Sequence, residues 1–408
     1  MSLPTDSPPL VLEPAPKPGG LNANVVALGF VSLLMGMSSA MIYGLMPVFL
    51  VTVMGASMAA VGALEGIAEA TNSFVKIFSG YISDRLGRRK PLVVMGYALS
   101  AINKLVFPLA DSVAMVLFAR IADRVGKGIR DAPRDALLTD ITPTQSRGAN
   151  FGLRLALYTV GAVIGPLFAI ALMTLSDNDF RLVFWIALIP GAISVAVVIF
   201  GVTERAEPAD NARRPALCRQ DFSQLPAAFW WTIALTAILA TARFSPAFLV
   251  LKMHHVGMDA AFVPAILAVM YVIYSASAYP FGVLADRTDR TVQLTAGIAI
   301  LVSADLVLAF SNTVWMTALG AALWGLQMGV SQGLLTAVIG DNAPAHLRGT
   351  AFGLFDLAVG VATFTASAGA GLLWTVGGPA MTFVTGASLC LLALGLLMFR
   401  PAIVARAA

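Results

Sequence analysis

Long apolar segments alternate with short polar loops along almost the whole chain. Twelve of these segments are predominantly apolar, and each is close to the length of about 20 residues that a helix needs to cross a membrane. The pattern therefore predicts twelve membrane-spanning helices. We place them at about 23–50, 57–82, 91–109, 113–138, 149–173, 181–202, 227–251, 260–284, 292–310, 313–339, 350–374 and 379–399.

The composition agrees with a chain surrounded by lipid. Hydrophobic residues make up 58% of the 408 positions and charged residues 12%, and the mean hydropathy is +0.83. A soluble domain carries about 25% charged residues, so too few polar side chains are present to cover a water-exposed surface. This excludes an ordinary soluble protein and predicts an all-α membrane protein.

Polar stretches divide the chain into two similar parts. A proline-rich start at 1–21 predicts a disordered tail, and no apolar run follows a basic start there as a signal peptide requires. The segment 203–226 is rich in charge and reads as a solvated linker. We therefore expect two six-helix bundles, at 22–202 and 227–400, with a second short tail at 401–408.

Basic residues in the loops give the orientation. The net charge is +4. If the N-terminus is inside, fifteen lysines and arginines fall in inside loops and tails, and only Arg181 and Lys252 fall outside. Cytoplasmic loops carry such an excess, so both termini are expected in the cytoplasm. The same distribution argues against nucleic-acid binding.

The two halves repeat one another. The segment 80–88 corresponds to 282–290 at an offset of 202 residues, and 140–153 corresponds to 341–354 at an offset of 201 residues. Two nearly equal offsets indicate duplicated halves related by an axis along the membrane normal, with a site at the midplane between them.

The loop after the second segment carries Gly80, Asp84, Arg85, Gly87 and Arg88, and together with the repeat it resembles the major facilitator superfamily. This resemblance implies a twelve-helix transporter in which the loop acts as a conformational latch, with a degraded copy in the second half. The segment 149–173 also carries a Gly-x3-Gly-Pro pattern that is similar to the antiporter signature of that superfamily. The latch residues are Gly80, Asp84, Arg85, Gly87, Arg88, Asp286 and Arg287, and the helix-bend residues are Gly161, Gly165 and Pro166.

The segment 113–138 is unusually charged for a span. Each charge facing lipid at the bilayer centre costs about 3 kcal/mol, so the segment either lies in the cytoplasm or turns its charges into the bundle. Closely spaced opposite charges, such as Arg134 and Asp135, favour the second arrangement. The resemblance then implies that Arg120 is linked to proton coupling, with a structural ion pair as the alternative.

The segment 57–82 carries a polar stripe. Glu65, Glu69, Asn72 and Lys76 are spaced by four, three and four residues, which puts them on one helix face. A buried carboxylate can exchange a proton when its surroundings change between wet and dry. Glu65 and Glu69 are therefore proton-carrier candidates. The alternative is that Glu69 pairs with Lys76 or Lys104 and holds helices together.

Other polar residues lie within the predicted spans and are candidates for lining a substrate cavity. The embedded set contains nine basic and seven acidic residues, which favours an anionic or zwitterionic substrate over a lipophilic cation. The cavity candidates are Asn72, Lys76, Arg154, Tyr158, Arg243, Tyr271, Tyr274, Gln327 and Asp356; Asp305 is also embedded.

These observations predict a secondary transporter of a bacterial inner membrane that exports a small organic molecule in exchange for protons. The protein is expected to be a monomer in the lipid bilayer, without catalytic activity, cofactor or metal, and the chain has no phosphate-binding loop for ATP. The alternatives are a facilitator or importer of an anionic metabolite, or a membrane sensor.

Overall fold

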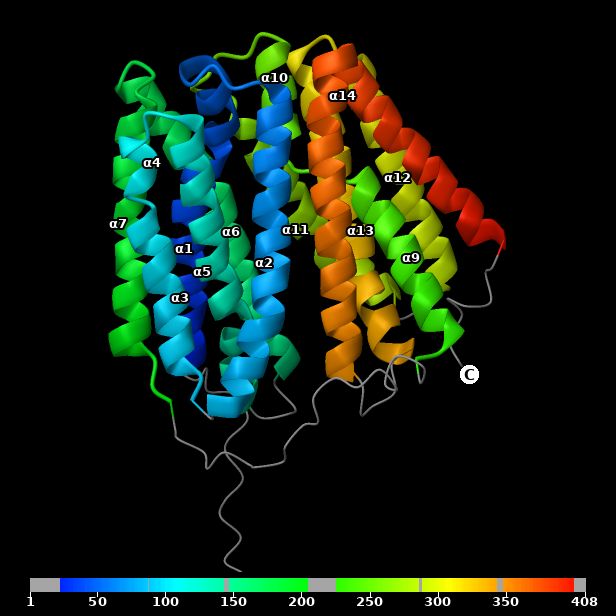
Figure 1. The fold of residues 1–408 in the computed structure, drawn as a ribbon. Helices are drawn as coiled ribbons and strands as arrows, with labels where there is room; N and C mark the ends of the chain where they lie inside the picture. Colours follow the sequence, from blue (N-terminus) through cyan, green and yellow to red (C-terminus); the bar gives the residue numbers. More distant parts are fainter. Residues whose placement is uncertain are drawn as a thin grey trace, which may run out of the picture.

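The computed structural model describes residues 23–86, 88–142, 147–204, 225–285, 288–342 and 348–399, and the regular secondary structure of these residues is entirely helical. Both predicted tails and nearly all of the predicted linker lie outside them. The helices run side by side and form two groups, α1 to α7 and α9 to α14 (Figure 1).

The first half contains the six predicted spans, of which one is broken. Residues Lys104 and Leu105 separate α3 from α4, so these two helices together make the third span. The bounds are α1 Ala23–Val48 with a π-helical turn at Phe49–Val53, α2 Met58–Leu86, α3 Lys90–Asn103, α4 Val106–Leu109, α5 Val113–Asp140, α6 Arg147–Leu175 and α7 Phe180–Gly201.

The second half also contains six spans. The break between α9 and α10 divides one span into two helices, whereas Gly378, with φ 72°, divides the long α14 into two spans. The bounds are α9 Ala227–Ala242, α10 Ala247–His255, α11 Ala265–Ala285, α12 Arg290–Phe310, α13 Val314–Asn342 and α14 Arg348–Phe399. The fold is therefore the predicted one, with twelve spans in two six-helix halves.

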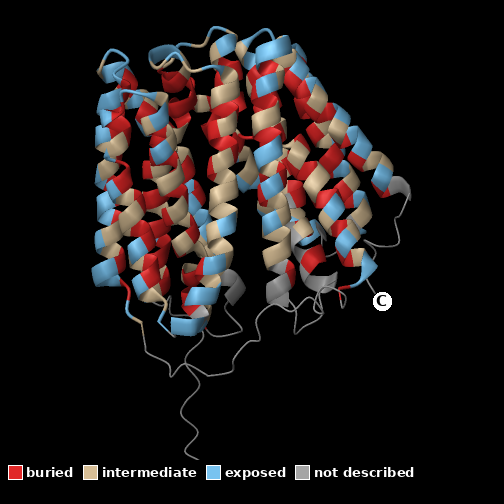
Figure 2. Cartoon of the chain, in the orientation of Figure 1, coloured by how far each residue is buried: buried red, intermediate tan, exposed pale blue. Residues whose placement is uncertain are grey.

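The surface of the bundle is suited to lipid. Eight stretches of the described residues are long and apolar enough to cross a membrane. The charged helices α2 and α5 are not among them. Large apolar side chains such as Leu175, Phe200 and Trp315 are each more than four-fifths exposed. Buried residues lie between the helices and exposed ones on their outer faces (Figure 2). The chain is therefore a multi-pass membrane protein.

Three helix pairs join the halves: α2 packs on α14, α6 on α11 and α1 on α10. Glycine makes the first of these contacts possible. A methyl group added at Gly66 would lie 2.8 Å from the backbone carbonyl oxygen of Phe364, and one added at Gly360 would lie 2.6 Å from the Ser73 side chain. The α2 and α14 backbones therefore approach closely along several turns.

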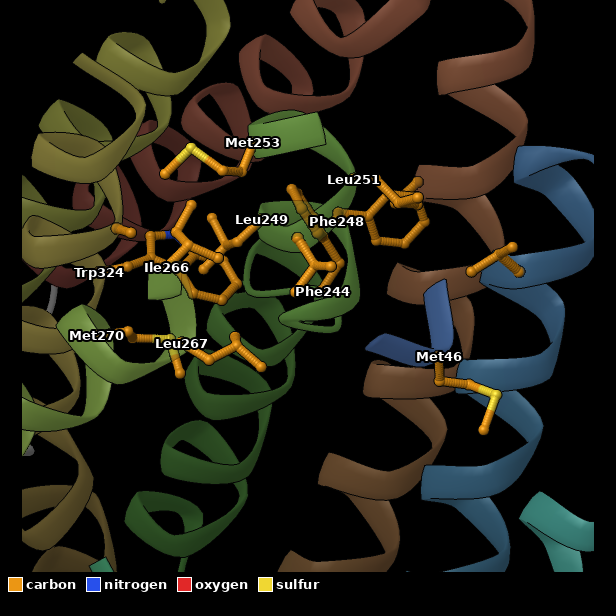
Figure 3. Packing of buried hydrophobic residues seen from close by; sticks show 14 of the residues in the cluster. Met46, Phe244, Phe248, Leu249, Leu251, Met253, Ile266, Leu267, Met270 and Trp324 are labelled. Atoms are coloured by element: carbon orange, nitrogen blue, oxygen red, sulfur yellow. The ribbon is translucent and has the colours of Figure 1, made fainter. Parts of the chain in front are cut away.

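The apolar core differs between the two ends of the bundle. We call the end at which α1 begins the near end and the end at which α2 begins the far end. At the far end one buried cluster includes residues of both halves, such as Met46 and Phe248 (Figure 3). At the near end, separate clusters form around Leu138 in the first half and Phe229 in the second. The halves therefore share a core at the far end.

Candidate functional site

Glu65 of α2 and Arg120 of α5 form a buried ion pair. The Nε and Nη2 atoms of Arg120 lie 3.1 and 2.8 Å from the two carboxylate oxygens of Glu65. Both residues are at most 5% exposed. The Arg120 guanidinium also stacks on the ring of Tyr43, 3.6 Å from its centroid. This bidentate geometry is the strongest form of the Arg–carboxylate interaction.

The same carboxylate reaches the other half of the protein. Ser245, in the second half, donates a hydrogen bond from Oγ to Glu65 Oε2 at 3.0 Å. Ser245 is buried, and its backbone N–H donates to Ser367 Oγ of α14 at 3.2 Å. Glu65 is therefore part of one buried network that joins α2 and α5 of the first half to α14 and the α9–α10 break of the second.

The break that holds Ser245 has a clear local cause. Pro246 has no N–H and cannot continue the hydrogen-bond ladder of α9. The backbone of Arg243 leaves the helical region, with φ −103° and ψ 79°, and α10 begins at Ala247. Discontinuous helices at the midplane form the binding sites of many transporters. The break thus leaves backbone groups near the interface between the two halves without hydrogen-bond partners in a helix.

A second ion pair lies one turn further along the same two helices. Arg124 Nη2 is 2.5 Å from Glu69 Oε1. The side chain of Glu69 is 29% exposed, compared with 7% for Glu65. Because α2 and α5 run parallel, both pairs have the same offset of 55 residues. The prediction that Glu69 pairs with Lys76 or Lys104 is therefore wrong, since Arg124 is closer in this register.

Two further charges of the first half are held by hydroxyl groups. The Tyr43 hydroxyl donates to Asp123 Oδ2, and Lys104 Nζ lies 2.6 Å from Ser38 Oγ and 3.1 Å from Ser39 Oγ. The other carboxylate oxygen of Asp123, Oδ1, has no hydrogen-bond partner among the described residues. The Tyr43 side chain therefore connects the charges of α5 to α1.

Toward the near end of α5, charges of opposite sign lie close together. Arg134 binds Asp131 at 2.9 Å and Asp135 at 3.0 Å, and Arg154 of α6 lies 3.7 Å from Asp135. Arg130 donates to Ser100 Oγ at 2.5 Å. Because α5 packs against α2 and α3 inside the bundle, its charges face other helices, as expected for a charged span.

Lys76 and Asp356 form an ion pair between the halves. The Lys76 Nζ atom of α2 lies 2.8 Å from Asp356 Oδ2 of α14, and the two side chains are 36% and 30% exposed. Both residues were predicted to line a cavity. In this structure they bind each other across the α2–α14 contact.

The remaining cavity candidates lie in several places. Tyr271 of α11 is close enough to Tyr158 of α6 to interact with it electrostatically across the halves. Tyr274 interacts in the same way with Arg243. Gln327 is buried and donates to Ser331 of its own helix at 2.7 Å.

Asn72 and Arg154 complete the predicted cavity residues. Asn72 is half-buried, and its Oδ1 has no hydrogen-bond partner among the described residues. Arg154 binds Asp135 in its own half. Tyr158 and Tyr271 both interact electrostatically with Glu69 and Arg124.

The predicted latch falls mainly outside the described residues. Gly87, Asp286 and Arg287 lie outside them, and so does the side chain of Asp84. Of the others, Gly80 lies in α2, Arg85 stacks 5.6 Å from the Tyr81 ring centroid and Arg88 is exposed. The latch stays a prediction.

The helix-bend motif lies where α6 packs on α1. A methyl group at Gly165 would lie 2.6 Å from the backbone carbonyl oxygen of Met37, and one at Gly161 would overlap the carbonyl of Leu33. The α6 helix continues through Pro166 without ending. The glycines therefore permit close packing, as expected, whereas the proline does not divide the helix.

Sequence reasoning missed Tyr43, Asp123 and Ser245 as members of the site. A signal was present for the ion pairs, because Glu65 and Glu69 have the same spacing of four as Arg120 and Arg124. No comparable pattern marks Ser245, whose contact with Glu65 depends on how the two halves pack.

Comparison with known proteins supports this fold. The family model of the Major Facilitator Superfamily matches residues 28–253 and 230–407. An uncharacterized MFS-type transporter of Methanocaldococcus jannaschii is 32% identical over 386 residues, covering 93% of this chain and 95% of that protein. The inner membrane transport protein YajR of Escherichia coli is 27% identical over 343 residues, covering 81% and 72%.

A multidrug resistance protein, MdtH of Photorhabdus laumondii, is 31% identical over 156 residues, or 38% of each chain. Among solved structures, a bacterial homolog of the human lysosomal transporter Spinster, inward-facing and occupied, has a TM-score of 0.72 at 17% identity. It covers 94% of this chain and 97% of that one. The nucleoside transporter NupG has a TM-score of 0.75 at 12% identity, covering 93% and 99%. With its fold and its matches over almost the whole length, the chain belongs to the major facilitator superfamily of membrane transporters.

Proposed function

We propose that this protein exports a small organic anion or zwitterion in exchange for protons, by alternating access across a bacterial inner membrane. In this proposal the near end faces the cytoplasm, as the excess of lysine and arginine in its loops indicates. The shared apolar core at the far end then corresponds to a state closed toward the outside.

The observation that carries the proposal is the Glu65–Arg120–Ser245 network. The carboxylate of Glu65 attracts Arg120 in its own half and accepts a hydrogen bond from Ser245 in the other half. A proton on Glu65 would remove its charge and weaken both interactions. Protonation of one buried group is thereby linked to the contact between the halves, which is what proton coupling requires.

Glu69 supplies a second carboxylate on the same face of α2. Its side chain is more exposed than that of Glu65 and lies closer to the near end. We assign Glu65 the role of the group whose protonation opens the far end. Glu69 then exchanges protons with the near side. Arg120 neutralises the charge of Glu65 when Glu65 is ionised.

The charges near the site favour an anionic or zwitterionic substrate. Among the described residues, Lys127 of α5 and Arg243 of the α9–α10 break form no salt bridge with an acidic residue. Lys127 interacts electrostatically with Glu69 and Asp131, whereas Arg243 interacts with Tyr274 and Cys390. Buried cations are usually paired. We propose that substrate carboxylate or phosphate groups bind these two residues from opposite halves.

The relatives agree with this reading in part. YajR is named an inner membrane transport protein and MdtH a multidrug resistance protein. These names support a membrane transporter of small molecules, and the second of them supports export.

The test uses purified protein in proteoliposomes that contain a pH-sensitive dye. A thermal-shift screen of organic anions, zwitterions and drugs first selects compounds that stabilise the protein. A selected compound should then drive proton movement with wild type. Glu65→Gln should bind the compound and move it without protons, whereas Asp111→Asn, a matched change in an exposed loop, should behave as wild type. Normal proton coupling in the combined Glu65→Gln and Glu69→Gln variant would contradict the proposal.

A facilitator or importer of an anionic metabolite is the second candidate, because the same cations would serve it. Collapsing the proton gradient separates the two. Uphill export stops without the gradient, whereas movement down a substrate gradient continues.

A further inference from the structure

Asp305 of α12 is a buried carboxyl group that the proposed transport cycle does not use. It is completely buried, at 0% exposure. Its Oδ1 accepts a hydrogen bond from Nε1 of Trp324 in α13 at 3.1 Å. Its Oδ2 has no hydrogen-bond partner among the described residues. A buried polar atom in this position needs an explanation, because such groups almost always have a partner.

A backbone carbonyl faces the same space as this oxygen. A methyl group added at Gly386 of α14 would lie 2.7 Å from Asp305 Oδ2 and 3.2 Å from the carbonyl oxygen of Ala242. Because Gly386 has no side chain, both oxygen atoms can lie close to its backbone.

The Ala242 carbonyl is available because of the break between α9 and α10. In a continuous helix it would accept from the backbone N–H four residues on, but that residue is Pro246, which has none. Ala242 is the last residue of α9, so its carbonyl lies at the negative end of the helix dipole. That end favours a positive charge or a donated proton.

The surroundings of Asp305 do not neutralise an ionised carboxylate. The titratable or charged groups near it are Cys390 of α14, which interacts with Asp305, and Arg243, which interacts with Cys390 and Tyr274. Asp305 forms no salt bridge with a described basic residue, although Arg243 is one residue from Ala242. An unpaired ionised carboxylate in a buried apolar site is very unfavourable, and such a group keeps its proton instead.

We propose that Asp305 is a second proton-binding site, in which the carboxyl group holds a proton on Oδ2 and directs it toward the Ala242 carbonyl. The bound ligand is a proton, since hard metal cations take about six oxygen ligands and the structure brings two oxygens to this space. Trp324 fixes the carboxyl group by donating to the other oxygen.

The site is connected to Glu65 through the helix break. The carbonyl of Ala242 lies beside Gly386 together with Asp305, and Ser245, three residues later, donates to Glu65. A movement of the break therefore changes the surroundings of both carboxyl groups. This link to transport rests on the proposed function, whereas the proton on Asp305 in the far-end-closed state does not.

Infrared difference spectroscopy of the purified full-length protein in lipid tests the proposal. At pH 7, wild type should show the carbonyl band of a protonated buried carboxyl group, and this band should be lost in Asp305→Asn. Trp324→Phe, which removes one donor and leaves the proton, should shift the band without removing it. Glu65→Gln should retain the band, so a failure of the proposed coupling role of Glu65 is distinguishable from a failure of this proposal.

Two results would overturn the proposal. One is a wild-type spectrum at pH 7 that is the same as that of Asp305→Asn. The other is loss of the band when choline is replaced by sodium, which would assign the site to a metal cation. If Asp305→Asn does not fold, the Trp324→Phe spectrum decides, since a band that this change leaves unshifted does not come from Asp305.

Discussion

The hydrogen bond between Ser245 and Glu65 should help to keep the far end closed. Ser245→Ala removes a 3.0 Å bond to a buried carboxylate that is paired with Arg120, and a bond to a charged group contributes about 1.5–3 kcal/mol. The bond forms between the halves, so its loss destabilises the far-end-closed state and not the first half alone. At the lower limit, the equilibrium between closed and open states should shift by roughly tenfold.

Distances between spin labels measure this shift directly. Positions 111 and 312 are exposed and lie in the equivalent far-end loops of the two halves. Labels there, in a background with Cys218→Ser and Cys390→Ala, should show a longer-distance population that grows in Ser245→Ala. Ser32→Ala is the matched control, since Ser32 donates a buried hydrogen bond within α1 alone, to Leu28.

A second variant separates the bridge from the local role of Ser245, whose Oγ also accepts from the Ala247 backbone N–H. Glu65→Gln leaves that bond in place but weakens the bridge, so it should shift the distances in the same direction. If Ser245→Ala and Ser32→Ala gave identical distance distributions, the bridge would not control closure and the reasoning would be wrong.

Three other predictions concern packing, the ion pair between the halves and helix capping. Gly161→Ala should lower stability by about 1–3 kcal/mol because the methyl group overlaps the α1 backbone, whereas Gly152→Ala, with no atom within 4 Å, should not; thermal unfolding compares them. A double-mutant cycle on Lys76 and Asp356 should give a coupling of about 0.5 kcal/mol, since both side chains are partly exposed, and a value above 2 would contradict this. Hydrogen bonds from the first backbone N–H groups of α12 lower the pKa of Asp289. The stabilising effect of Asp289 should therefore be present above its unfolded pKa and be lost as the pH falls through its folded pKa. Asp289→Asn should remove this pH dependence of unfolding and keep the cap.

The spans could be predicted from the sequence because membrane thickness sets their length. The charged segment expected at 113–138 is α5, Val113–Asp140, and the segment expected at 149–173 is α6, Arg147–Leu175. The breaks were not predicted. Pro246 lies at a helix break in this chain, whereas Pro166 lies within a continuous helix. A proline in the local sequence therefore does not decide whether a helix is broken.

The partners of the buried charges depend on helix register. Glu65 and Glu69 were correctly placed on one face of α2, but that face meets both α5 and α14, and each offers charged or polar groups. Arg120 and Arg124 are the partners because parallel packing of α2 and α5 brings positions 55 residues apart together. The repeated spacing of four predicts these ion pairs only when the two helices are known to be parallel and adjacent.

The broken helix explains why two carboxyl groups in different halves can respond to one movement. In a continuous helix, the N–H of Ser245 would be used within the helix and could not contact Ser367, whereas the carbonyl of Ala242 would still lack a donor because Pro246 has no N–H. The break instead directs the N–H of Ser245 toward Ser367 and its hydroxyl toward Glu65, while the carbonyl of Ala242 and Asp305 both lie close to Gly386. Straightening this segment would have to release both hydrogen bonds of Ser245 together, because they arise from the same residue. In the proposed transport cycle, the break is therefore the element best placed to couple proton binding to the movement of the halves.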